Sequence, residues 1–132
     1  MKHLFYLLIV SLFAISCGTS SKLTQKNSLD DVPVTIKNDS LHYEITIIDN
    51  GFNTYLHSIA KPKNYYTQQY YESKNKFYVT EWNIRAQNPL RYDDTIYENK
   101  IDYDFNVDYG LDVNYKLYNY FKFVEYKYRQ KF

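Results

Sequence analysis

The sequence of 132 residues contains one cysteine, three glycines and three prolines. Because Cys17 has no second cysteine to pair with, an internal disulfide is excluded as a source of stability. No uncharged apolar run reaches the roughly 20 residues that a membrane-spanning helix requires. Charge of neither sign is in clear excess, with 16 basic and 15 acidic side chains. A domain without excess positive charge is poorly suited to neutralise phosphates, so we expect no nucleic-acid partner.

The uncharged, largely apolar segment 4–15 predicts a lipoprotein signal peptide over residues 1–16. It has the length of a secretory leader and is too short to span a bilayer. Small side chains at Ala14 and Ser16 precede Cys17, which is the spacing that the lipoprotein signal peptidase recognises. Cys17 is therefore the predicted lipidation site. Two or three acyl chains anchor a protein stably, because each buried methylene contributes about 0.8 kcal/mol.

Residues 17–30 are predicted to form a flexible tether, and residues 31–132 a single small globular domain. The tether is rich in small and polar residues and offers little to bury. Gly18 rather than an acidic residue follows Cys17. By analogy with Gram-negative sorting rules, this favours the outer membrane, and the lack of an adjacent acidic run favours its periplasmic face. The alternative is an ordinary secretory leader that ends near a chance cysteine.

Hydrophobic periodicity predicts an α+β fold, in which a short two-stranded sheet is followed by two main amphipathic helices joined by an acidic, Tyr-rich loop. Apolar and polar side chains alternate over residues 41–48, as in a half-buried strand. Residues 34–36 can pair with it as a short edge strand. A short helix is predicted over residues 52–59, after a turn signal at Asp49-Asn50-Gly51.

The first main helix is predicted over about 65–86 and is followed by the acidic, Tyr-rich loop, which extends from Pro89 to Gly110. The tyrosines of this loop indicate a packed rather than a disordered segment. The second main helix runs nearly to the C-terminus, and its pattern places Asn114 and Asn119 off the apolar stripe. That stripe comprises Val113, Leu117, Tyr120, Phe121, Val124 and Tyr128.

Oxygen-bearing side chains occupy alternate positions in the acidic loop, as at the start of a calcium-binding loop. These metal-site candidates are Asp102, Asp104, Asn106 and Asp108. Val107 and Val113 stand where such a loop requires glycine and a bidentate glutamate. A looser cation site is one interpretation, and an acidic loop that caps the last helix is the favoured one.

Catalytic motifs are not found, so we expect a protein that is not an enzyme and uses no cofactor. His42 and His57 lie in different predicted elements, and no nucleophile turn, phosphate loop or dinucleotide fingerprint occurs. The 17 tyrosines offer large rings with polar tips. Tyr70, Tyr71 and Trp82 are candidates for an aromatic platform that binds glycan. The alternative, which we favour, is that their helical spacing builds the core.

Several short stretches resemble small lipoproteins of the flavobacterial type that are grouped under a domain of unknown function. The stretches include Glu81-Trp82-Asn83, Ile101-Asp102-Tyr103, Asn106-Val107-Asp108-Tyr109-Gly110 and Leu117-Tyr118-Asn119-Tyr120-Phe121. The resemblance implies a lipoprotein but no activity, and no catalytic or binding residue follows from it.

Together these features predict a lipid-anchored lipoprotein of the cell envelope, held to membrane lipid through acylated Cys17. We expect a non-enzymatic accessory or interaction protein at the outer membrane, facing the periplasm, with an envelope protein as partner. The alternative function is a glycan- or peptidoglycan-binding module that uses tyrosine and tryptophan side chains.

Overall fold

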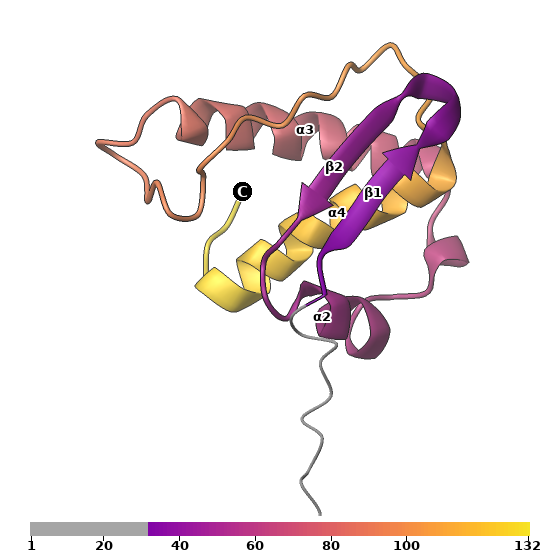
Figure 1. The fold of residues 1–132 in the computed structure, drawn as a ribbon, viewed down its shortest axis with the longest axis horizontal. Coiled ribbons are helices and arrows are strands. Elements are labelled where there is room, and N and C mark those ends of the chain that lie inside the picture. Colours follow the sequence, from indigo (N-terminus) through magenta and orange to yellow (C-terminus); the bar gives the residue numbers. More distant parts are fainter. Residues whose placement is uncertain (1–31) are drawn as a thin grey trace, which may run out of the picture.

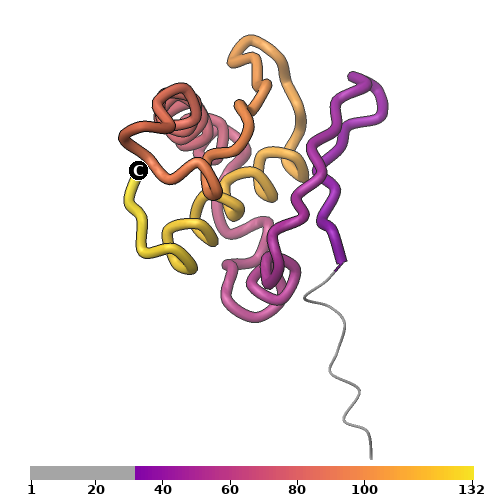
Figure 2. Tube along the Cα trace, turned by 60° about the vertical axis from the view of Figure 1, so that its left-hand side comes forward, coloured from indigo at the N-terminus to yellow at the C-terminus, as the bar shows by residue number. Residues whose placement is uncertain are grey.

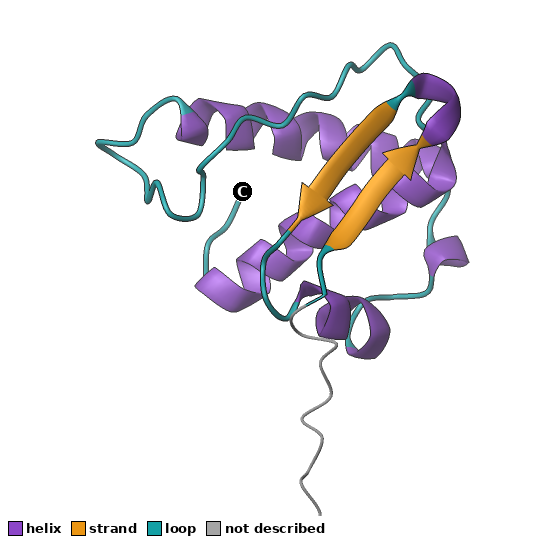
Figure 3. Ribbon diagram, in the orientation of Figure 1, coloured by secondary structure: helices purple, strands orange, loops and turns teal. Residues whose placement is uncertain are grey.

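The computed structural model describes residues 32–132, which form an α+β domain with one two-stranded sheet and three α-helices (Figures 1 and 3). The predicted fold class is therefore confirmed. The predicted signal peptide, with Ala14, Ser16 and Cys17, and the tether lie outside the described residues. Within residues 32–132, none of the helices combines the length and the apolar character needed to cross a membrane. The elements are β1 (Val34–Asn38), β2 (Tyr43–Ile47), α2 (Phe52–Ser58), α3 (Gln68–Ala86) and α4 (Gly110–Tyr128).

The hairpin of β1 and β2 is antiparallel, with Ile36 opposite Ile45. Its short turn, Asp39–Leu41, is a 3₁₀ helix capped by Asn38, whose Oδ1 accepts hydrogen bonds from the backbone N–H groups of Ser40 and Leu41. The strand predicted over 41–48 begins only at Tyr43, because Leu41 belongs to this turn. The predicted alternation holds within β2: Ile45 and Ile47 face the interior, whereas Glu44 and Thr46 are exposed.

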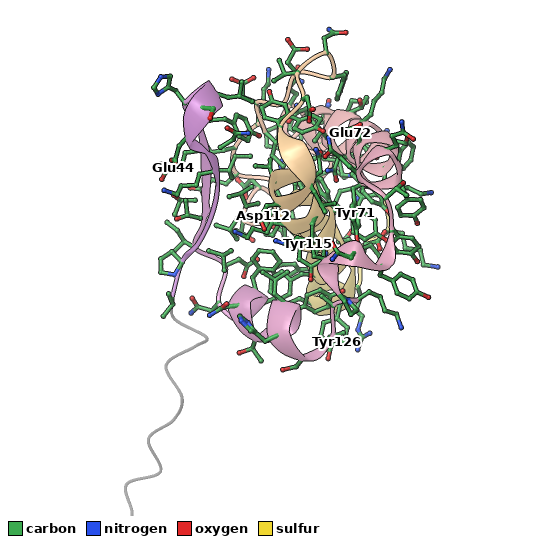
Figure 4. All side chains as sticks on the ribbon, turned by 90° about the vertical axis from the view of Figure 1, so that its right-hand side faces the viewer. Glu44, Tyr71, Glu72, Asp112, Tyr115 and Tyr126 are labelled. Atoms are coloured by element: carbon green, nitrogen blue, oxygen red, sulfur yellow. The ribbon has the colours of Figure 1, made fainter. Side chains whose placement is uncertain are left out.

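Three layers make up the domain, with α4 in the middle (Figure 2). The hairpin covers one side of α4, and α3 covers the other. Figure 4 shows the same order, from the hairpin with Glu44, through α4 with Asp112 and Tyr115, to α3 with Tyr71 and Glu72. The short helix α2 packs against the C-terminal half of α4, where Phe52 contacts Phe123 at 5.4 Å between ring centroids.

The central place of α4 corrects one sequence prediction, because Asn114 and Asn119 are buried rather than solvent-facing. Asn114 lies at the contact with α3 and accepts hydrogen bonds from Asn75 Nδ2 at its backbone oxygen (3.0 Å) and at Oδ1 (3.1 Å). Asn119 donates to the backbone oxygen of Tyr115. A helix enclosed by other elements on several sides buries more than one stripe, and each buried amide then needs a hydrogen-bond partner.

The predicted packed loop is present between α3 and α4, without regular helix or strand. Three of its tyrosines are buried: Tyr97 is 3 % exposed, Tyr103 8 % and Tyr109 6 %. In Figure 1 the loop runs beside α3 and returns across the top of the domain to the start of α4.

Candidate functional site

A groove of about 750 Å³ lies between β2 and the loop segment 95–102. Its floor is formed by α4, with partly exposed rings of Tyr120 and Tyr128 and the buried Leu117. Isoleucine side chains add apolar surface at both walls, Ile45 and Ile47 from β2, and Ile96 and Ile101 from the loop. The groove therefore has an apolar base between a strand on one side and an irregular loop segment on the other.

The first wall is the edge of β2 that faces away from β1. Within residues 32–132 the sheet has two strands, so β2 has a neighbour on one side only (Figure 1). The backbone groups on the other side of β2 make no hydrogen bond with the rest of the described chain. An unpaired strand edge presents a row of N–H and C=O groups that another extended chain can pair with.

The second wall is held rigidly against α3 by two side chains. The amide of Asn83 pairs with Ile101 as a neighbouring strand would, donating to its carbonyl oxygen at 2.9 Å and accepting from its N–H at 2.8 Å. Trp82 Nε1 donates to the carbonyl oxygen of Asn99 at 2.8 Å. The intervening Lys100 and the following Asp102 have backbone groups without a hydrogen-bond partner among residues 32–132. The sequence alone does not indicate this role of Asn83, because a single asparagine on a helix forms no recognisable motif.

The charge of the groove is unbalanced at its rim. Glu44, Glu98 and Asp102 are exposed there, and none of them forms an ion pair with another described residue. Two lysines line the groove, Lys100 and Lys127. Lys127 forms an ion pair with Asp49, whereas Lys100 forms none with another residue of 32–132. The free charge at the rim is therefore mainly negative.

Asp49 lines the groove and neutralises Lys127. Its carboxylate accepts hydrogen bonds from Lys127 Nζ and from the hydroxyl of Tyr128, the latter at 2.9 Å. Burial disfavours the charge of Lys127, but the hydrogen bonds to Asp49 and Tyr128 together outweigh this and raise its pKa. Burial also raises the pKa of the neighbouring Tyr120 hydroxyl far above its usual value, and the negative charge of Asp49 adds to the effect. Tyr120 is therefore a neutral phenol at any physiological pH.

The proposed aromatic platform is not assembled by the structure. Tyr71 is 1 % exposed and Trp82 is 4 % exposed, and both pack within the domain. Stacking on a sugar requires an accessible ring face, so these two side chains build the core instead. Tyr70 alone stays partly exposed and stacks on Tyr66 with 4.1 Å between ring centroids. Beside this pair Tyr65 is 57 % exposed.

The four metal-site candidates do not converge on one point, and they differ in what they contact. Asp102 lines the groove, whereas Asp104 accepts hydrogen bonds from the N–H and the side-chain amide of Asn106. Asp108 accepts from Gln68 Nε2 at 2.6 Å and from the N–H of Gly110, the first residue of α4. Residues 32–132 contain no group of three or more His, Cys, Asp or Glu side chains placed to hold a metal ion. This arrangement supports the interpretation in which the loop caps the last helix.

Comparison with known proteins places the chain in a family. A family model described as a family of unknown function, DUF6146, matches residues 4–132. The chain belongs to DUF6146. The expectation of an uncharacterised family is thereby confirmed, and both walls of the groove lie inside the part of the chain that the DUF6146 model covers. No curated protein and no solved structure matches the chain.

Proposed function

We propose that this member of DUF6146 is a lipid-anchored lipoprotein of the flavobacterial type, held at the periplasmic face of the outer membrane through acylated Cys17. Its domain is a non-enzymatic interaction module that binds an envelope protein in the groove between β2 and residues 95–102. The signal-peptide pattern of residues 1–16 supports the anchor. The single observation that carries the binding role is the unpaired edge of β2 beside a groove of about 750 Å³.

Binding fits the chemistry of this groove better than catalysis. Its walls offer unpaired backbone groups, its floor offers aromatic and aliphatic surface, and its rim offers carboxylates. These are the groups that recognise a polypeptide. The groove lining includes neither histidine nor cysteine, the side chains most often used as general base and as thiol nucleophile.

The anchor is tested with the Cys17→Ser variant expressed in the native host or a related one. The wild-type protein is expected in the membrane fraction and to incorporate labelled fatty acid, whereas the variant should be unlabelled and released from the membrane. A variant that stays membrane-bound with unchanged gel mobility would contradict the lipoprotein assignment.

The binding role is tested by placing a photo-crosslinking amino acid at Lys100, which lines the groove, and at Asp39 in the hairpin turn as a control. We expect one envelope protein to be captured from Lys100 and not from Asp39. The same adduct should re-form when the purified partner is mixed with the purified domain. Equal capture from both positions, or none from Lys100, would remove the groove as the binding site.

A second candidate function is binding of glycan or peptidoglycan, favoured by the stacked pair Tyr66 and Tyr70 with the exposed Tyr65 beside it. Aromatic faces of this kind suit sugar rings. The purified protein should then pellet with isolated sacculi in the absence of other proteins. Loss of pelleting in Tyr65→Ala and Tyr70→Ala would support this function, and equal retention of both variants would count against it.

A further inference from the structure

We infer that the groove binds one extended segment of a partner protein, which adds to β2 as a third strand and alternates apolar with basic side chains. This inference rests on the proposed function of the groove and specifies its ligand. It follows from three properties of the molecule: the unequal protection of the two sheet edges, the apolar floor and the unpaired carboxylates.

The two edges of the hairpin differ in how they are protected against pairing. The β1 edge carries Lys37 and follows Pro33 directly, and lysine and proline are common means of blocking an exposed edge. The β2 edge has neither residue within Tyr43–Ile47, and its register with β1 contains no bulge. The edge left open is therefore the one that faces the groove.

The length and rigidity of the walls suit an extended chain. The five residues of β2 can pair with a segment of about the same length, roughly 17 Å at about 3.3 Å per residue. The opposite wall, fixed to α3 through Asn83 and Trp82, does not have to be ordered when the ligand enters. Because both walls are already in place, the free energy spent on ordering the groove when a ligand binds is small.

Side chains of an added strand would alternate between the floor and the solvent, as those of β2 do. Residues on the inner side would extend the row of Ile45 and Ile47 and contact Tyr120, Tyr128 and Ile101. Apolar side chains, and β-branched ones in particular, fit this surface. Every second residue of the ligand is therefore apolar.

Residues on the outer side would lie beside Glu44 and between it and the carboxylates of Glu98 and Asp102. These three acids have no ion pair among the described residues, and the only lysine at the groove that is similarly unpaired is Lys100. Lysine or arginine at the outer positions would give opposite-charge pairs across the strands, whereas acidic side chains would be repelled.

The test uses the mature chain with Cys17→Ser and a capped synthetic peptide of alternating lysine and valine. Binding is followed by fluorescence anisotropy and by amide shifts in NMR spectra. A peptide with glutamate in place of lysine is the charge control. Two further peptides carry N-methyl groups on alternate residues, so that the methyl groups point to one strand edge in the first and to the other edge in the second.

We expect the lysine–valine peptide to bind, the glutamate peptide not to bind, and one methylation pattern to weaken binding roughly tenfold or more through lost backbone hydrogen bonds. The pattern that weakens binding also reports the direction of the added strand. Glu44→Lys and Asp102→Lys should each weaken binding roughly three- to tenfold, whereas Asp39→Lys, a charge reversal of an exposed residue outside the groove, should not.

The inference would be overturned by absence of peptide binding, by both methylated peptides binding as tightly as the unmethylated peptide, or by the glutamate peptide binding as tightly as the lysine peptide. The photo-crosslinking result at Lys100 then shows whether only the inferred strand ligand is wrong or the binding role of the groove as well. Capture of an envelope protein at Lys100 without peptide binding leaves the groove as a binding site with a ligand of another shape. Failure of both experiments removes the proposed function as well.

Discussion

Arg85 of α3 is buried, and its replacement provides a quantitative test of how the C-terminal end of the chain is held. The side chain is part of a residue only 7 % exposed. Its Nε donates to Glu81 at 2.8 Å, Nη1 to the hydroxyl of Tyr97 at 2.8 Å and Nη2 to the carbonyl oxygen of Lys131 at 2.6 Å. The guanidinium also lies 4.8 Å from the ring centroid of Phe132. One side chain thus joins α3, the acidic loop and the C-terminal residues.

The magnitude follows from these contacts. Removing one partner of a buried ion pair costs about 3–5 kcal/mol, a figure that already includes the groups left without partners. Glu81 is partly exposed, but the Tyr97 hydroxyl and the Lys131 carbonyl oxygen also lose their donor with Arg85. We therefore expect Arg85→Ala to lower the free energy of unfolding by about 3–5 kcal/mol, out of about 5–15 kcal/mol for a typical domain. Arg85→Lys keeps the charge but loses the planar fork that reaches three acceptors, so about 1.5–3 kcal/mol should be lost.

Urea unfolding of the Cys17→Ser chain, followed by circular dichroism, measures this difference. With a slope of about 1–3 kcal/mol per molar urea, Arg85→Ala should lower the midpoint by roughly 2 M. Arg91→Ala is the matched control, because Arg91 is exposed and only approaches the ring of Tyr92. Arg91→Ala should change the free energy of unfolding by no more than about 0.5 kcal/mol. A loss below about 1 kcal/mol in Arg85→Ala would refute the role assigned to Arg85.

Three further predictions concern the loop and its contact with α4. Burial raises the pKa of Tyr103 to about 12, whereas tyrosine in an unfolded chain ionises near pH 10. The free energy of unfolding should therefore be unaffected by this group below pH 10. It should fall as the pH rises toward 12, by up to about 1.4 kcal/mol per pH unit for each such tyrosine. Tyrosinate absorbance should then rise together with the loss of circular dichroism, whereas complete ionisation near pH 10 in a folded protein would contradict it. Calorimetric titration with calcium should give no heat and no shift in melting temperature, because Asp104 and Asp108 already accept hydrogen bonds from nearby backbone N–H groups. Measurable heat of binding would instead support a cation site in the loop. Asn114→Ala should lower the free energy of unfolding, measured in urea, by about 1–3 kcal/mol, since it leaves the buried Tyr103 hydroxyl without its acceptor and removes one of the two acceptors of Asn75 Nδ2. A neutral effect would show that the Tyr103 hydroxyl finds another partner.

Local patterns in the sequence predict which segments form strands and helices but not all of their bounds, since the helix predicted over about 65–86 begins at Gln68. The alternation around Ile45 predicted a half-buried strand, and the stripe of Val113, Leu117 and Phe121 predicted the last helix, since both follow from one buried face. The same logic failed where a helix is enclosed on several sides. Asn114 and Asn119 look solvent-facing by periodicity, yet α4 is covered by α3, the hairpin and α2.

The groove could not be predicted in this way, because its walls come from segments about fifty residues apart that no local period relates. The clamp of Asn83 on Ile101 depends on the path of the loop and leaves no spacing in the sequence. Once the pairing of β1 with β2 is known, the sequence does show that Lys37 and Pro33 protect the β1 edge and that β2 has no equivalent residue.

The tyrosines of the acidic loop explain how a segment with so little regular structure forms a rigid wall. Tyr97, Tyr103 and Tyr109 recur every six residues and all three rings are buried. Each hydroxyl is also used: Tyr97 accepts from the Arg85 guanidinium, Tyr103 donates to Asn114 Oδ1 at 2.5 Å, and Tyr109 accepts from a loop N–H at 3.0 Å. At these three points the buried ring stabilises the loop by apolar packing, and the hydroxyl gives a polar group its hydrogen-bond partner. These contacts fix the loop where no helix or strand is present. Between these anchors Lys100 and Asp102 keep backbone groups without a hydrogen-bond partner among residues 32–132, and the wall is already in place before a ligand enters, so a strand can bind in the groove without a large ordering cost.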